Sequence, residues 1–178
     1  MEHIVLGLLI LKDLTIYELN TIFKLSLSMI YAASYGTLQY SIKKLLKDKL
    51  IIFDERVENG RNKKIYTITN AGRESFFSWM NEDILARDVE TEILSKVYFL
   101  GLIPNKNDKL KIINKMAQAV DLYLSQLENI KFQNKPVDLP AEQETIAKYQ
   151  FTTLDYGIGV SGFARQWLKS LKEELLET

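Results

Sequence analysis

Hydrophobic positions recur at helical spacing through the first fifty residues of the chain. Residues 2–11, 16–25 and 34–49 each show the period of a helix with one apolar face. Residues 27–33 lack a clear period and are expected to connect the second helix to the third. The pattern predicts three short helices that bury their apolar faces against one another.

A β-hairpin is predicted directly after the third helix. Residues 50–58 alternate weakly, Asn59-Gly60 is a strong hairpin-turn signal, and residues 63–69 supply the return strand. The tip is polybasic, with the sequence Gly60-Arg61-Asn62-Lys63-Lys64. A fourth helix is expected over residues 70–81. This order of elements is typical of a winged helix, in which one helix enters the DNA major groove and the wing touches the backbone.

The C-terminal half is predicted to be helical throughout. Residues 81–88 separate it from the winged helix, and three helical patterns follow, over residues 89–102, 106–131 and 141–176. We therefore predict a mainly α fold with a winged helix-turn-helix and a two-stranded wing in residues 1–80. Residues 82–178 are predicted to form a helical domain that dimerises and that binds an effector, if the protein has one.

The third helix has one apolar face and one basic face. At about 100° per residue, one side of the helix gathers Leu38, Ile42, Leu45 and Leu46, with Tyr35 at its margin. The opposite side has no acid and carries Gly36, Thr37, Tyr40, Lys43, Lys44 and Lys47. Thr37 and Tyr40 lie towards the end of the helix that meets base edges in a groove, whereas the later lysines suit phosphates.

Two alternatives for this helix stay open. A basic face on its own is also compatible with an ordinary solvated surface, but its combination with the basic hairpin favours DNA. Gly36 either lets the backbone approach a phosphate near the helix start or allows tight helix packing. Ser34 is the expected N-cap. The predicted DNA contacts are Ser34, Gly36, Thr37, Tyr40, Lys43, Lys44, Arg61, Lys63 and Lys64.

The charge distribution supports a nucleic-acid partner although the net charge is zero. Residues 34–73 hold nine Lys and Arg and four acids, a net charge of +5, so the remainder carries −5. A basic segment joined to an acidic remainder focuses positive potential on one surface.

The chain has no residue pattern typical of catalysis, metal binding or a cofactor. It has no Cys and a single His, His3, so neither a thiolate site, a His-based metal site nor a Ser-His-Asp triad can form. P-loop and Rossmann glycine patterns are absent. We predict a protein that is not an enzyme. The lack of Cys suits a reducing compartment, and the apolar run Ile4–Leu11 is too short to span a bilayer, so we expect a cytoplasmic location and no membrane partner.

The last predicted helix carries a wide aromatic and apolar stripe that three glycines interrupt. The predicted dimerisation residues lie on this stripe: Tyr149, Tyr156, Val160, Phe163, Trp167 and Leu171. Each glycine in a helix interior costs about 1 kcal/mol relative to alanine, so Gly157, Gly159 and Gly162 need a reason. Close approach of helices in a dimer, room for a flat ligand, and a kink or break are the three explanations.

The residues described so far resemble the PadR-type transcriptional regulators, in their longer form with a helical C-terminal domain. The matching segments are Leu6-Gly7-Leu8-Leu9, Ile16-Tyr17-Glu18-Leu19, Ser34-Tyr35-Gly36-Thr37 with Lys43-Lys44-Leu45, Gly60-Arg61 through Lys64, Tyr66 and Thr69 to Gly72. Weaker matches follow at Arg87-Asp88, Lys96-Val97-Tyr98-Phe99, Tyr156-Gly157-Ile158 and Trp167-Leu168. The resemblance therefore covers most of the chain.

The resemblance implies a homodimeric repressor that binds a palindromic operator in double-stranded DNA. It also implies that the C-terminal helices hold the dimer, and some members of the family respond to phenolic acids or other small aromatic or hydrophobic compounds. The chain departs from the family at Gln39-Tyr40, where Tyr-Pro is usual, so neither base preference nor effector identity is carried over. A small-molecule sensor or a protein-interaction module without a specific operator is the alternative function.

Overall fold

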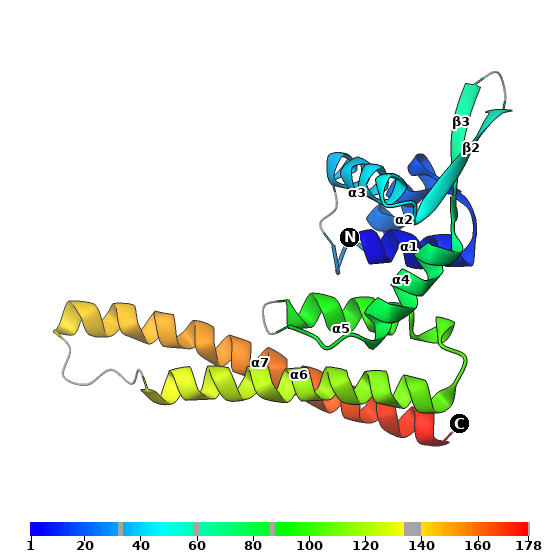
Figure 1. The fold of residues 1–178 in the computed structure, drawn as a ribbon. Helices are drawn as coiled ribbons and strands as arrows, with labels where there is room; N and C mark the ends of the chain where they lie inside the picture. Colours follow the sequence, from blue (N-terminus) through cyan, green and yellow to red (C-terminus); the bar gives the residue numbers. More distant parts are fainter. Residues whose placement is uncertain (32–33, 59–60, 86–87, 134–139, 178) are drawn as a thin grey trace. The chain divides into compact units, whose positions relative to one another are not determined.

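The computed structural model describes residues 1–31, 34–58, 61–85, 88–133 and 140–177 (Figure 1). The chain divides into two compact units. Unit 1 comprises Met1–Glu82 with Leu94–Phe99, and unit 2 comprises Asp83–Ile93 with Leu100–Thr178. The two units are described separately below.

Unit 1 is a winged helix, as the sequence predicts. Its elements in chain order are α1 (Glu2–Leu11), β1 (Leu14–Thr15), α2 (Ile16–Ser26), α3 (Tyr35–Lys47), β2 (Ile51–Glu58), β3 (Arg61–Ile68) and α4 (Asn70–Asn81). The β2–β3 hairpin extends away from the helices as the wing (Figure 1). The predicted turn at Asn59-Gly60 lies outside the described residues. The predicted mainly α fold is confirmed.

The sheet has three strands, whereas the sequence predicts only the two of the wing. The antiparallel order is β1-β3-β2, and β1 pairs Leu14 with Tyr66 and Thr15 with Ile65. A strand of two residues is too short to show alternation, so the hydrophobic pattern could not reveal it. The third strand holds the base of the wing beside the start of α2.

The ends of α2 and α3 follow from local capping. Glu18 N–H donates to Thr15 Oγ1 at 3.2 Å and Thr15 N–H donates to Glu18 Oε2 at 2.8 Å, which confirms the predicted capping box. The third helix ends at Lys47, two residues earlier than predicted. Lys49 is left-handed with φ 58°, and Leu50 N–H donates to the Leu45 carbonyl at 2.9 Å. This Schellman-type ending turns the chain directly into β2.

Aromatic rings pack around α1 in the core of unit 1. A Cβ on Gly7 would lie 2.7 Å from the Phe99 ring and 2.8 Å from the Phe76 ring, so only glycine fits there without rearrangement. The Phe76 and Phe99 rings meet edge to face with centroids 5.5 Å apart. His3 stacks on Trp79, and burial lowers the pKa of His3 below its ordinary value. The start of α1 is thereby part of the packed core.

A lysine is buried beside this core. Lys96 is 1% exposed, and its Nζ donates to the carbonyl oxygens of Glu82 at 2.6 Å and Met80 at 3.5 Å. These carbonyls lie at the end of α4, where the last groups of a helix lack partners within the helix. The ammonium also lies 5.5 Å from the centre of the Trp79 ring. Lys96 therefore stabilises the C-terminal end of α4 by hydrogen bonds to its free carbonyl groups.

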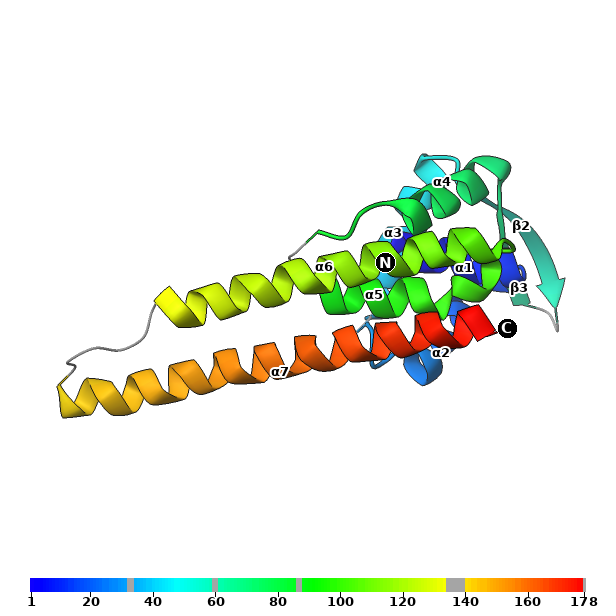
Figure 2. The same cartoon turned by 90° about the horizontal axis from the view of Figure 1, so that it is seen from below.

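Unit 2 is helical in its described residues. It contains the first half of α5 (Val89–Tyr98), a 3-10 turn over Leu100–Leu102, α6 (Lys106–Gln133) and α7 (Ala141–Glu177). Figures 1 and 2 show α6 and α7 side by side as an antiparallel pair. The predicted single helix over residues 89–102 is wrong, because the α-helix ends at Tyr98 and the chain tightens into the 3-10 turn. Within the described ranges, no helix is long and apolar enough to cross a membrane.

Candidate nucleic-acid interface and dimer face

The third helix starts on a serine cap. Ser34 has extended backbone angles and its Oγ accepts from the Thr37 N–H at 3.1 Å, which confirms the predicted cap. The Thr37 hydroxyl in turn donates to the Ser34 carbonyl at 2.8 Å. The Thr37 side chain is therefore held in place, with its oxygen exposed and able to accept a further hydrogen bond.

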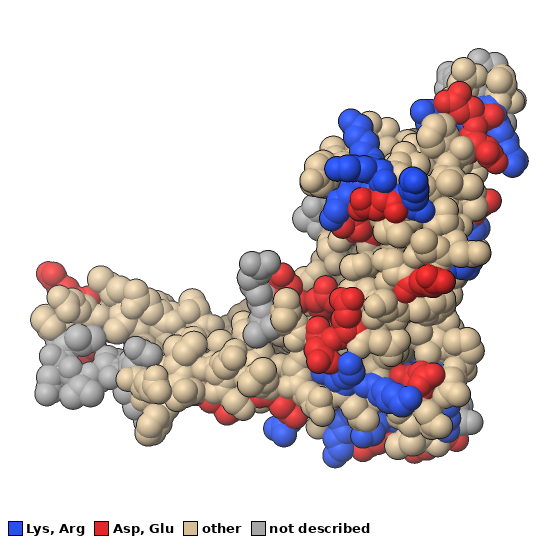
Figure 3. All heavy atoms as spheres, in the orientation of Figure 1, with Lys and Arg blue, Asp and Glu red and all other residues tan. Residues whose placement is uncertain are grey.

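The two faces of α3 separate as the sequence predicts. Leu38, Ile42 and Leu45 are buried in the core of unit 1. The exposed face carries the predicted residues Gly36, Thr37, Tyr40, Lys43, Lys44 and Lys47. Tyr40 is 69% exposed, an unusual position for an aromatic ring that has only to stabilise the fold. Figure 3 shows basic side chains gathered over α3, with acidic side chains beside them.

Gly36 serves no tight packing against the residues that the structure describes. A Cβ at this position would meet only the Ser34 Oγ, at 3.7 Å, which is an ordinary contact. The alternative that the glycine allows tight helix packing is therefore unsupported. The remaining explanation is that the glycine lets a phosphate approach the backbone near the start of α3.

One lysine of the exposed face is held by an acid from another helix. Lys44 Nζ lies 2.8 Å from Glu2 Oε2, and both side chains stay partly exposed. The hydrogen bond that Lys44 donates to Glu2, together with the negative charge of Glu2, raises the pKa of Lys44 above its ordinary value. Glu2 lies 42 residues before Lys44, so helical spacing gives no signal for this pair. An anion that approaches Lys44 must compete with Glu2.

The wing mixes basic and acidic side chains. Lys64 stands opposite Glu55 in the strand register, with Lys64 Nζ 3.4 Å from Glu55 Oε1 and 4.2 Å from the centre of the Phe53 ring. Lys63 stands opposite Arg56. Such exposed pairs are weak and readily exchanged for another anion. The Arg61 backbone opens β3 next to the tip.

A groove lies between the wing and the start of α2. It has a volume of about 900 Å³, and its walls include Tyr17, Glu18, Asn62 and Lys63. Tyr17 is 75% exposed at this groove and is not among the predicted DNA contacts. The signal that could have marked Tyr17 is its place in the first turn of a helix after a cap, on the side away from Leu19.

The last helix has one buried side and, on its opposite side, an aromatic stripe that the described residues leave exposed. Ala147, Ser161 and Leu168 are buried. Tyr149, Tyr156 and Phe163 recur every seven residues, about 200° around the helix from the first set, and are 67%, 76% and 71% exposed. Of the other predicted dimerisation residues, Val160, Trp167 and Leu171 are partly exposed. An exposed aromatic stripe of this length is typical of a surface that binds another protein chain.

The three glycines of α7 differ in their surroundings. The helix runs unbroken from Ala141 to Glu177, so the explanation that they break it is wrong. A Cβ on Gly157 would meet Leu127 at 3.3 Å, whereas Gly159 and Gly162 have nothing within 4 Å. Gly159 and Gly162 therefore serve no contact within the described part of the chain.

The helix-turn-helix, the exposed basic helix and the wing define a winged-helix protein of the DNA-binding class. Comparisons with known proteins agree. Residues 5–77 match the transcriptional regulator PadR-like family. The negative transcriptional regulator PadR of Bacillus subtilis (strain 168) is 25% identical over 163 residues, which cover 88% of this chain and 82% of that protein. Over its winged helix the chain is therefore similar to the PadR-like transcriptional regulators, and the relative that it matches along most of its length is a regulator as well.

Two solved structures are among those that the chain resembles. The crystal structure of smu.1604c from Streptococcus mutans UA159 is 27% identical, covers 95% of this chain and 96% of its own, and has a TM-score of 0.46. Bacillus subtilis PadR in complex with operator DNA is 20% identical, covers 98% of both chains, and has a TM-score of 0.47.

Proposed function

We propose that this protein is a cytoplasmic, homodimeric repressor that binds a specific operator and that a small aromatic or hydrophobic molecule releases. The observation that carries the proposal is the exposed face of α3, to which the helix itself contributes three lysines and no acid, together with Lys63 and Lys64 on the wing. The relative from Bacillus subtilis, named as a negative regulator, supports repression. The proposed division is a DNA-binding domain in residues 1–80 and a dimerisation and effector domain in residues 82–178.

The proposed contacts divide into two kinds. Thr37 and Tyr40 read base edges, because they lie near the start of α3 and are exposed. The proposed phosphate contacts are Ser34, Gly36, Lys43, Lys44, Arg61, Lys63 and Lys64. Phosphate contacts position the protein, and base contacts provide the sequence preference. Gln39-Tyr40 departs from the Tyr-Pro that the family resemblance implies, so we expect this chain to prefer an operator sequence of its own.

A homodimer would present two such helices to one face of the duplex. The uncovered stripe of Tyr149, Tyr156 and Phe163 supports an isologous contact between two copies of α7. Two α3 helices about 34 Å apart would enter successive major grooves and read a palindrome. A ligand that favours a different separation of the two helices would release the operator.

A gel shift with the DNA upstream of the protein's own gene tests this function. We expect a sharp shift that resists unrelated competitor DNA, and its loss when Tyr40 is changed to Ala. Weak smearing that disappears at moderate salt would favour a sensor or interaction module without a specific operator. A sharp shift that Tyr40→Ala leaves unchanged would remove α3 from base recognition.

Neutralising the wing should weaken binding to all DNA sequences alike. In Arg61→Ala or Lys63→Ala, the slope of log K against log salt should fall by about one unit, because one phosphate contact and its counterion are lost. Fluorescence anisotropy over a salt series measures this slope for operator and unrelated DNA.

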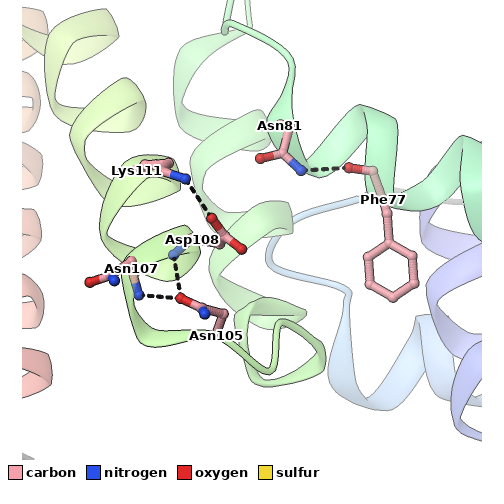
Figure 4. A network of polar contacts seen from close by, with 6 residues as sticks. All are labelled: Phe77, Asn81, Asn105, Asn107, Asp108 and Lys111. Atoms are coloured by element: carbon pink, nitrogen blue, oxygen red, sulfur yellow. Dashed lines mark hydrogen bonds and ion pairs between the residues drawn. The ribbon is translucent and has the colours of Figure 1, made fainter.

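A lysine outside the winged helix provides the control. Lys111 on α6 pairs with Asp108 at 2.7 Å, beside the Asn105 side chain that caps the start of the helix (Figure 4). Lys111→Ala should leave the salt slope unchanged. An unchanged slope in both wing variants would exclude the wing from the contact set.

Removing the acid that holds Lys44 should strengthen DNA binding. In wild-type protein, Lys44 must give up its ion pair with Glu2 before it can bind a DNA phosphate. Glu2→Gln removes that ion pair, so the affinity for DNA should rise by about two- to fivefold, the range expected for an exposed ion pair. Glu74→Gln on α4 makes the same charge change at an exposed position and is the matched control. In a Lys44→Ala background, Glu2→Gln should have no further effect beyond that of the control. An equal rise in DNA affinity in Glu2→Gln and Glu74→Gln would mean that the change in net charge, and not the release of Lys44, explains the effect.

A further inference from the structure

Unit 2 contains a cavity between the start of α5 and the middle of α6 and α7. Its volume is about 270 Å³, and its apolar wall is formed by Val89, Ile93, Val120, Val160 and Ala164. An apolar cavity of ~150 Å³ holds a benzene ring. This cavity therefore has room for one aromatic ring with a short substituent.

Helix α7 forms one wall of the cavity. Gly157 lines the cavity, and a Cβ there would press on Leu127 at 3.3 Å. The buried Ser161 hydroxyl donates to the Gly157 carbonyl at 2.8 Å, so its hydrogen is already used within α7. An unfilled cavity lowers stability in proportion to its volume. Gly157 itself is explained by its close packing against Leu127 of α6, which does not line the cavity, so the case for an occupant rests on the cavity and its polar groups.

The polar groups at the cavity indicate the charge of that occupant. Glu90 stands at the edge, together with the rings of Tyr123 and Tyr156. Among the described residues that line the cavity, none is Lys or Arg, and Glu90 forms no ion pair with a described residue. A carboxylate beside aromatic rings attracts a cation and repels an anion.

We propose that this cavity binds a small aromatic amine, with the ring between α5, α6 and α7 and the ammonium group at Glu90. The inference rests on the ligand response in the proposed function and gives that ligand a site and a charge. An aromatic acid of the same size would place its carboxylate beside Glu90 and should bind poorly.

The fold also connects this cavity to the winged helix through one continuous helix. Val89, Glu90 and Ile93 in the first half of α5 line the cavity and belong to unit 2. The second half belongs to unit 1, where Lys96 donates to the carbonyls of Met80 and Glu82 at the end of α4. A ligand that shifts the start of α5 therefore acts on a helix whose other half is fastened to the DNA-binding domain. This is the route by which we expect the amine to weaken operator binding.

Calorimetric titration of the full-length protein, without DNA, tests the site with three probes of similar size. The probes are phenethylamine, 2-phenylethanol and phenylacetate. We expect phenethylamine to bind at least fivefold more tightly than the acid, with the alcohol between them. Glu90→Gln should remove most of the preference for the amine and leave the alcohol unchanged. Glu128→Gln, at an exposed position elsewhere on α6, should change neither.

A second variant tests the location. Ala164→Leu should fill the cavity and abolish binding of all three probes, while circular dichroism shows a folded protein. Equal or tighter binding of phenylacetate, or unchanged binding in Ala164→Leu, would overturn the proposal. So would the absence of binding by every probe, the result expected if a side chain of a second copy occupies the cavity. The titration contains no DNA, so its failure can be told apart from a failed gel shift. A failed gel shift would overturn the proposed regulatory function but not the ligand site.

Discussion

Replacing Gly72 with alanine is expected to destabilise the winged helix severely. Gly72 lies in the first turn of α4, and a Cβ there would lie 2.1 Å from the carbonyl oxygen of Leu50 and 2.8 Å from Ile68 Cγ1. The Leu50 carbonyl cannot simply move, because it accepts from the Thr69 N–H at 3.0 Å and from the Thr69 hydroxyl at 3.0 Å. Overpacking against fixed backbone should cost about 3 kcal/mol or more, the upper part of the usual range.

Urea unfolding measures this loss. With an ordinary m-value, the midpoint of the Gly72→Ala transition should fall by about 1 M or more. Gly36→Ala is the matched control, because a Cβ at Gly36 meets only Ser34 Oγ at 3.7 Å. Its stability should stay the same or rise by up to about 1 kcal/mol, since alanine favours helix over glycine. A wild-type midpoint for Gly72→Ala would contradict the close approach of α4 to Leu50.

Local signals are the part of this fold that the sequence predicts well. The boundaries of α1 and α4 follow from helical periodicity. The starts of α2 and α3 follow from the capping residues Thr15 and Ser34, whose hydrogen bonds join groups only three residues apart. The exposed and buried faces of α3 likewise depend on spacing within one helix. Each of these features is decided by neighbours along the chain.

Features that depend on distant residues are the part that spacing misses. The strand β1 exists because Leu14 and Thr15 meet β3, fifty residues further along the chain. Lys96 is buried because carbonyls at the end of α4 satisfy its ammonium group, although lysine is among the residues least often buried. The pair of Glu2 with Lys44 and the cavity at Gly157 are likewise formed only when separate helices come together.

Placing a charge on the exposed stripe of α7 is expected to separate the proposed dimer. Phe163 is 71% exposed within the chain and lies on the opposite side of α7 from the buried Ser161 and Leu168. In Phe163→Glu, an isologous contact would bring two carboxylates into an apolar interface, because each copy contributes the same surface. Loss of a central aromatic contact costs about 2 kcal/mol or more, so the dissociation constant should rise by about 30-fold or more.

Sedimentation at micromolar concentration measures the change from dimer to monomer, with circular dichroism as a check on folding. Gln150→Glu adds the same charge on a polar flank of α7 and should leave the dimer intact. Operator affinity should fall by about 10²- to 10⁴-fold in Phe163→Glu, because a monomer engages one half-site and loses the effective concentration of the second. Phe163 lies in α7, outside the winged helix. If operator affinity falls together with dissociation of the dimer while the protein stays folded, then operator binding depends on the dimer. A variant that remains dimeric and binds its operator normally would place the dimer contact elsewhere on the chain.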